Sequence, residues 1–273
     1  MKIKELPKTI YGKIKGFRLT RKVFSYPYIL FLMFFVITPL VIVLVNAFLS
    51  DGQFTLNNFK DLATDGSSLK VLGTSIVVGI VTTLICLLLG YPVAYILSKW
   101  SSGSIIVILF ILPMWVNFLI RTYALQTIFE NVGITLGMGT VIFGMVYNFI
   151  PFMIMPLHTT ISNIDKSFKE AAQDLGASPV QTFFKTTLPL SLPGIISGIT
   201  MVFIPTISAF AISEMLSNNS IMLFGDSINL KFHAGEQLYG VGSVMSLIML
   251  ALVLISNFFM NKINKGEAAK NLW

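Results

Sequence analysis

The sequence predicts an all-α integral membrane protein with six transmembrane helices. Hydrophobic residues occupy 55% of the 273 positions and charged residues only 11%, a composition far from that of a soluble domain. The apolar residues gather in stretches of about 20, the length that a helix needs to cross a bilayer. Turn-forming and charged residues separate these stretches.

The first two spans are expected over residues 28–49 and 69–97. The first run is too long for the core of a signal peptide and no small-residue cleavage site follows it, so we expect it to be retained as a membrane helix. The polar segment between the spans predicts an external loop with a short interfacial helix near residues 56–62. Pro92 is expected to kink the second span.

The third and fourth spans are expected over residues 105–127 and 140–160. The third carries an unusual number of polar side chains for a membrane helix. The fourth contains Pro151 and Pro156, which predict breaks in the helix because proline lacks a backbone N–H.

The fifth span is expected over residues 193–216, with Pro205 midway, and the sixth over residues 240–260. Gly194 and Gly198 form a small-xxx-small pair in the fifth span, which predicts the close approach of another helix. A polar loop connects these two spans.

Residues 162–189 are the one long polar interruption of the apolar sequence. Ser167 and Glu170 predict a capping box at the start of a short amphipathic helix, and Gly176 ends it. Residues 178–179 suit the N-cap and first position of a second helix. The apolar face of this pair is too small to form a domain alone, so we expect a partner protein to cover it.

The charges predict the orientation of the chain. Most of the 19 Lys and Arg residues lie in the amino-terminal arm (residues 1–26), the 162–189 segment and the tail (residues 263–273). The positive-inside rule therefore places both termini in the cytoplasm. Anionic membrane lipid accounts for the excess of positive charge, so no nucleic-acid partner is expected.

Residues 162–189 also resemble the E-A-A loop of ABC-importer permeases, with an isoleucine of that pattern replaced by Thr186. The resemblance implies a MetI-like permease fold over residues 27–262, in which this loop docks in a groove of an ATP-binding subunit. The residues implied for ATPase coupling are Glu170, Ala171, Ala172, Asp174, Gly176, Phe183, Leu188 and Pro189.

Four stretches, residues 87–99, 112–125, 150–161 and 170–195, are similar to permeases of spermidine/putrescine importers. The resemblance covers roughly residues 20–262. It implies a subunit of the bacterial plasma (inner) membrane that receives polyamines from an external solute-binding protein. The other implied partners are a second homologous permease and two ATP-binding subunits. This chain has no G-x-x-x-x-G-K-[ST] loop, so ATP and Mg are expected on those subunits and no cofactor or enzymatic activity on this one.

Ionisable groups within or beside the spans are candidates for the substrate pathway, because such groups are costly in a membrane. Polar amides and aromatic residues there are candidates as well. Glu214 is the carboxylate expected to meet a cationic amine, and aromatic faces attract alkylammonium groups. The candidates are Glu214, Trp115, Asn117, Tyr123, Tyr147 and Asp226. Asp226 and Glu236 are expected to contact the solute-binding protein rather than the substrate.

The same residues also have structural interpretations. Aromatic residues in spans commonly face lipid, and Asn117 and Asn148 can bond a neighbouring helix instead of lining a channel. Arg121 is expected to pair two helices through Glu130 or Glu214. No metal site is expected.

Two other functions stay open at this stage. One is a permease of the same fold for another small solute, such as a metal, an anion or an amino acid. The other is a stand-alone secondary transporter, which the 162–189 segment argues against and which would be expected to show repeated halves.

Overall fold

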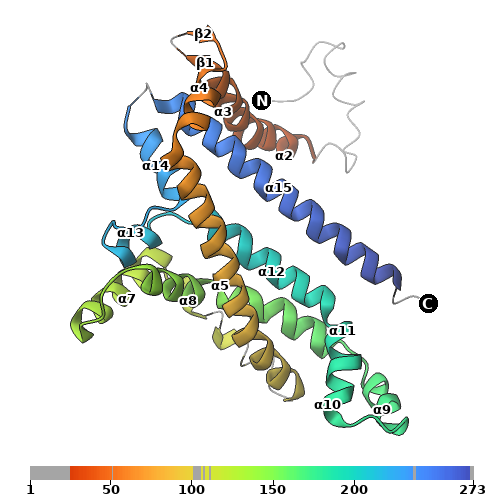
Figure 1. Ribbon diagram of the computed structural model, residues 1–273. Coiled ribbons are helices and arrows are strands. Elements are labelled where there is room, and N and C mark those ends of the chain that lie inside the picture. The colour runs from red at the N-terminus through yellow and green to blue at the C-terminus, as the bar shows by residue number, and fades with distance from the viewer. Residues whose placement is uncertain are drawn as a thin grey trace, which may run out of the picture.

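The computed structural model describes residues 25–50, 52–100, 106, 108–110, 112–235 and 238–270, with side chains up to residue 262. Most of the basic arm, Glu236 and the side chains of the tail lie outside the described residues. Four described helices are long and apolar enough to cross a membrane, and two further helix pairs pass the same test together but are bent by more than 40°, which gives six spans if each pair counts as one. Long helices lie between a β-hairpin at one end of the molecule and short helices at the other (Figure 1).

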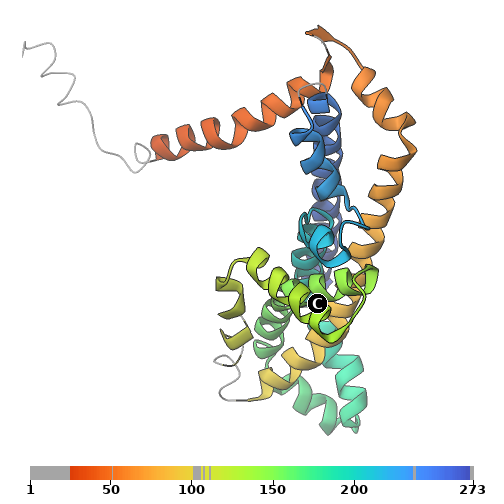
Figure 2. The ribbon, with the colours of Figure 1, turned by 90° about the vertical axis from the view of Figure 1, so that its left-hand side faces the viewer.

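The first span is a 24-residue helix whose amino-terminal part stands away from the other spans in Figure 2, while its carboxyl-terminal part packs against the sixth span. Its amino-terminal half has no buried residue, and Ala47 near its end is buried. The span and the elements after it are α2 (Ser25–Leu32), η2 (Met33–Ile37), α3 (Thr38–Phe48), β1 (Leu49–Ser50), β2 (Gln53–Phe54) and α4 (Asn57–Thr64). The expected interfacial helix is therefore confirmed as α4, whereas the hairpin was not foreseen.

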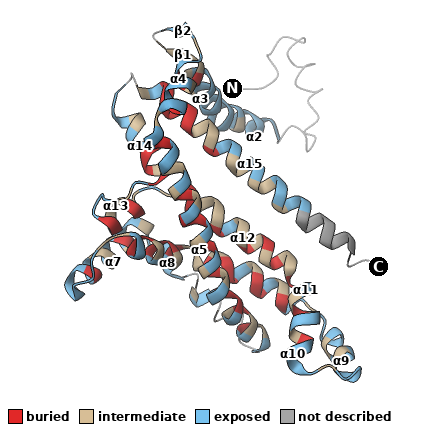
Figure 3. Ribbon diagram, in the orientation of Figure 1, coloured by how far each residue is buried: buried red, intermediate tan, exposed pale blue. Residues whose placement is uncertain are grey.

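Three helices pack at the centre of the molecule: α5 (Gly66–Lys99), α8 (Met138–Ser162) and α12 (Leu192–Ile207). Buried residues gather along them, as Figure 3 shows. Added Cβ atoms on Gly194 and Gly198 would lie 2.6 Å from Thr160 Oγ1 and Met153 Sδ of α8. The predicted close helix approach is thus confirmed.

The expected break of the fourth span is wrong, because α8 continues as an α-helix through Pro151 and Pro156. It is the most buried of the four unbroken spans. Its residues pack with those of α5 and α12, and membrane helices tolerate proline where neighbouring groups support the freed backbone. The second span also continues as a helix through Pro92.

The third span is not one helix over residues 105–127. The segment Ile108–Trp115, which contains η3 (Leu112–Trp115), meets α7 (Phe118–Val132) at 93°. Asn117 Oδ1 accepts a hydrogen bond from the Leu119 N–H at 2.8 Å and so caps α7. The polar residues of this span therefore mark a break and a new helix start.

The fifth span ends at Ile207 rather than at residue 216. A turn separates it from α13 (Ile212–Ser217), and the expected polar loop contains α14 (Phe224–His233). Ala211 in the turn has a φ of 68°, a conformation that L-residues seldom adopt, so the chain changes direction there. The sixth span is the first part of α15 (Tyr239–Lys270), and this helix continues past residue 260.

Candidate functional site

Two short helices joined at a glycine form the candidate coupling surface. They are α9 (Lys166–Asp174) and α10 (Pro179–Thr182), and η4 (Phe183–Thr187) and α11 (Leu188–Leu190) extend the second toward the membrane. Gly176 has a φ of 84°, and its N–H donates to the Gln173 carbonyl at 2.9 Å. The predicted glycine elbow is therefore confirmed.

The caps of these helices differ in part from the prediction. Asp165, not Ser167, caps α9, because its Oδ1 accepts the Ser167 N–H at 2.9 Å. The same backbone N–H holds the pKa of the Asp165 carboxyl below its usual value. Ser178 caps α10 as predicted, and Gln181 completes a capping box with it.

The coupling surface exposes apolar side chains that no described part of the chain covers. Leu175, at the tip, is 88% exposed, and Phe168, Val180 and Phe184 are also exposed. Glu170 lies among them on α9 and is exposed too. An exposed apolar face of this kind is typical of a surface that another protein or the membrane covers.

Not all of the residues implied for coupling lie on that exposed surface. Ala171, Asp174, Gly176 and Pro189 are exposed, and Ala172 is half-buried. Phe183 and Leu188 turn inward and pack on the core formed by α5, α8 and α12. The structure therefore divides the implied set into an outer face and an inner anchor.

Aromatic residues of α5 hold this inner anchor. The Phe183 ring meets the rings of Tyr95 and Tyr91 edge to face, with centroids 5.2 and 5.8 Å away. The Tyr91 hydroxyl lies 2.9 Å from Ser191 Oγ, at the bend between α11 and α12. The Lys99 ammonium sits 4.2 Å from the Tyr95 ring centroid. A movement of α9 and α10 would thus reach both α5 and α12.

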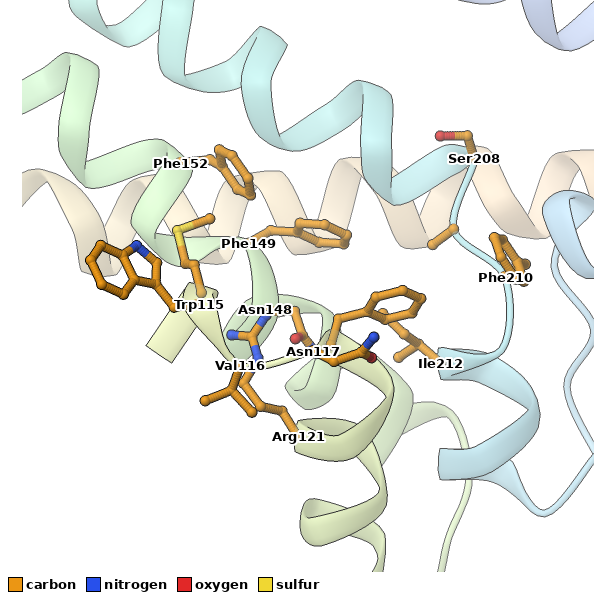
Figure 4. Close-up of a pocket in the computed structure, with 13 residues that line it drawn as sticks. Trp115, Val116, Asn117, Arg121, Asn148, Phe149, Phe152, Ser208, Phe210 and Ile212 are labelled. Carbon is orange, nitrogen blue, oxygen red and sulfur yellow. The ribbon is translucent and has the colours of Figure 1, made fainter. Parts of the chain in front are cut away.

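A second candidate site is a pocket of about 580 Å³ near the bend of the third span (Figure 4). It is lined by the η3–α7 junction, the middle of α8 and the turn after α12. The lining residues are Met114, Trp115, Val116, Asn117, Phe118, Arg121, Asn148, Phe149, Phe152, Ser208, Ala209, Phe210 and Ile212.

Two of the six residues predicted for the pathway line this pocket. They are Trp115, which is 83% exposed, and Asn117, whose side-chain oxygen also caps α7. Tyr123 is 63% exposed and Tyr147 is less so, and neither lines the pocket. Glu214 is half-buried on α13, also outside the lining. The transport roles of all these residues stay predictions.

Asp226 is 1% exposed, so it is not presented to a docking protein in this structure. Its carboxylate accepts hydrogen bonds from the N–H groups of Ala211 and Leu223, each at 2.8 Å, and from the Ser213 hydroxyl. It therefore fixes the turn that forms one wall of the pocket. Gly225 lies directly against the carbonyls of that turn, where no Cβ would fit.

Arg121 lines the pocket, and the predicted ion pairs with Glu130 and Glu214 are absent from the described structure. Glu130 instead accepts a hydrogen bond from Gln126 Nε2 at 3.0 Å. The guanidinium lies 5.9 Å from the Tyr147 ring centroid. Its Nε and Nη1 atoms are buried without a hydrogen-bond partner among the described residues.

The model of the family described as "Binding-protein-dependent transport system inner membrane component" matches residues 87–267. This match covers more than half of the chain. The chain belongs to that family.

Curated relatives agree with this assignment. The spermidine/putrescine transport system permease proteins PotB of Haemophilus influenzae and Escherichia coli are each 33% identical to this chain. The alignments cover 86% and 82% of this chain and 90% and 91% of the relatives. A PotB homolog of Mycoplasma genitalium is 29% identical over 71% of this chain and 73% of its own length.

Solved structures support the fold of the permease. A bacterial ABC transporter involved in the import of alginate matches with a TM-score of 0.67 at 13% identity, covering 93% of this chain and 99% of that one. The inward-facing MetNI methionine ABC transporter matches with a TM-score of 0.60 at 19% identity, covering 73% and 95%. The predicted MetI-like permease fold is therefore confirmed.

Sequence reasoning missed most of the pocket wall in this permease. Phe149, Phe152, Ser208 and Phe210 carry no signal that separates them from other membrane residues. The positive φ at Ala211 could not be predicted from the sequence either, because alanine rarely adopts this conformation. Asn148 was noted as a channel candidate, and the structure places it in the pocket with its Oδ1 unpaired.

Proposed function

We propose that this chain is the permease subunit of an ATP-driven importer that translocates spermidine or putrescine. The observation that carries the proposal is the 33% identity to two curated spermidine/putrescine permeases over nearly their whole length. An external solute-binding protein would deliver the polyamine. The chain itself would hold no ATP and perform no chemical step.

The assembly would contain a second homologous permease and two ATP-binding subunits that bind ATP and Mg. The exposed apolar residues of α9 and α10 support docking of the ATP-binding subunit there, with Glu170 at the contact. Closure of the two ATP-binding subunits would push the coupling surface and shift the bundle between inward- and outward-facing states. Both termini would then lie on the cytoplasmic side of the bacterial plasma membrane, as the coupling surface does.

The pocket near the bend of the third span is our candidate for part of the pathway. Trp115 offers an aromatic face, and such faces attract alkylammonium groups by about 0.5 to 2 kcal/mol. Asn117, Asn148 and Ser208 add polar groups among apolar neighbours. A weak site suits a permease, because tight binding would slow release of the solute.

One observation favours a different solute for the same fold. Arg121 is the sole charged residue among those that line the pocket, and it repels a polycation. An anionic or zwitterionic solute would meet this charge favourably. The substrate therefore has to be decided by a transport measurement.

The test is uptake of radiolabelled spermidine by cells that lack this gene and carry the wild type or Gly176→Asp. We expect wild type to restore uptake, with competition by polyamines only, and Gly176→Asp to abolish it. A side chain at a φ of 84° strains the elbow and disturbs the coupling surface.

Gly52→Asp is the matched control. Gly52 has a φ of 74° and open space around it, as Gly176 does, but it lies in the hairpin at the opposite end of the molecule. We expect it to support uptake. Equal uptake by Gly176→Asp and wild type would contradict the coupling role. If the wild-type chain copurifies with an ATPase but restores no spermidine uptake, the assignment of a polyamine as the solute would be contradicted.

A further inference from the structure

We propose that the Arg121 guanidinium pairs with a carboxylate of the second permease subunit, inserted into the pocket at the bend of the third span. The proposal rests on the proposed function in one respect, since it requires a second permease. It does not depend on the solute being a polyamine.

The Arg121 side chain is half-buried, and two of its three guanidinium nitrogens lack partners. Nε and Nη1 are buried and have no acceptor among the described residues. A guanidinium is permanently charged, and buried donors without an acceptor destabilise a structure. An anionic acceptor supplied by another molecule would satisfy both nitrogens and offset the charge.

The pocket itself supplies no anionic acceptor, because its lining contains no Asp or Glu. The Arg121 side chain runs from α7 toward Asn148 (Figure 4), whose Oδ1 is also unpaired. One hydrogen bond between the two would still leave the charge uncompensated and would satisfy only one of the three N–H groups on Nε and Nη1.

One wall of the pocket is the non-helical turn at residues 208–211, and irregular backbone within a membrane occurs only where protein covers it or water reaches it. A covering protein subunit therefore suits this wall, whereas lipid and its phosphate do not. A cationic solute cannot supply the negative charge. An anionic solute would supply one, and the copurification test below, which contains no solute, separates that source from the second permease.

Exposed apolar side chains lie in and near this pocket. Trp115 and Phe210 line it and are exposed, and Ile120 is exposed on the same helix as Arg121. Exposed aromatic and apolar residues suit the core of a protein interface, and a charge pair across an interface fixes its register. A carboxylate of the partner permease would also cancel the positive charge that the pathway otherwise presents to a cation.

The test uses the assembled complex, with an affinity tag on this chain, and measures how much second permease copurifies per tagged chain. We expect Arg121→Glu to lower that ratio about tenfold or more, because two carboxylates would then meet. Lys60→Glu, an equal charge reversal at an exposed position of α4, should leave the ratio unchanged. Retention of the ATP-binding subunit checks that the variant chain is folded.

The decisive step is reversal. Each membrane-embedded Asp or Glu of the second permease is changed to Lys in combination with Arg121→Glu, and one of these changes should restore copurification. Normal recovery of the second permease by Arg121→Glu would overturn the proposal, and so would the failure of every acid-to-Lys change to restore it. No polyamine is present, so this result is independent of the uptake experiment.

Discussion

The coupling surface and the pocket are built in opposite ways. The coupling surface is formed by one continuous stretch whose helices are capped by their own neighbours, Asp165 and Ser178, and whose apolar face is exposed. The pocket is assembled from three segments far apart in the sequence and is held by the buried carboxylate of Asp226. A substitution at the first should therefore impair function without unfolding the chain, and one at the second should impair both.

The largest expected effect is on uptake at the coupling surface. Glu170→Lys should lower solute uptake about tenfold or more, because it reverses a charge at the proposed contact with the ATP-binding subunit. The amount of protein in the membrane should stay at the wild-type level, since Glu170 is exposed.

Glu130→Lys is the matched control, because Glu130 is an exposed carboxylate on α7, outside the coupling surface. It should support uptake. Equal loss of uptake in both variants, or loss of Glu170→Lys from the membrane, would remove the distinction between the two regions.

The next effect is on stability behind the pocket. The Asp226 carboxylate accepts hydrogen bonds from three donors, and in Asp226→Asn the amide NH₂ would face at least one of these donors instead of an acceptor oxygen. We expect this to lower the free energy of unfolding by about 3 kcal/mol. The thermal midpoint of the purified complex should fall and uptake should fall with it. Asp61→Asn, at an exposed position of α4, should change neither. A wild-type midpoint for Asp226→Asn would show that the pocket wall does not depend on this carboxylate.

The smallest effect is a local pH dependence at the start of α9. The pKa of Asp165 is lowered in the folded chain, so its cap is complete above the ordinary carboxyl value of 3.8 and is lost as the pH falls below it. Amide hydrogen exchange at Ser167, corrected for the intrinsic pH dependence, should accelerate in acid. Asp165→Asn keeps a side-chain acceptor without a titrating group, and it should remove this pH dependence. Identical profiles would show that the carboxylate does not hold the turn.

These differences explain what the sequence could predict. Gly176 and Ser178 shape the backbone through contacts with residues next to them in the sequence. The glycine elbow and the cap of α10 could therefore be predicted from the sequence. The close approach at Gly194 and Gly198 could also be predicted, because small residues at that spacing in a membrane helix usually allow another helix to pack closely. Even at the coupling surface the pattern predicts Ser167 as the cap of α9, whereas the cap is Asp165, two residues earlier.

The pocket was less predictable because its elements depend on distant contacts. The third span breaks between η3, which contains Pro113, and α7, which Asn117 caps, yet Pro151 and Pro156 leave α8 intact. Local sequence does not separate these cases, because neighbouring helices decide whether proline can be accommodated. The turn at Ala211 likewise exists because Asp226, 15 residues later, accepts its N–H.

The bend at Ser191 determines how a push at the cytoplasmic end would travel. The helix formed by Pro179–Leu190 meets α12 at 61°, and α12 leads directly to the turn that forms the pocket wall. If both helices move as rigid bodies, a displacement along the first has a larger component across α12 than along it, since the angle exceeds 45°. A thrust toward the membrane would thus become mainly a sideways swing of the pocket wall, which opens or closes a passage more effectively than a piston movement along it.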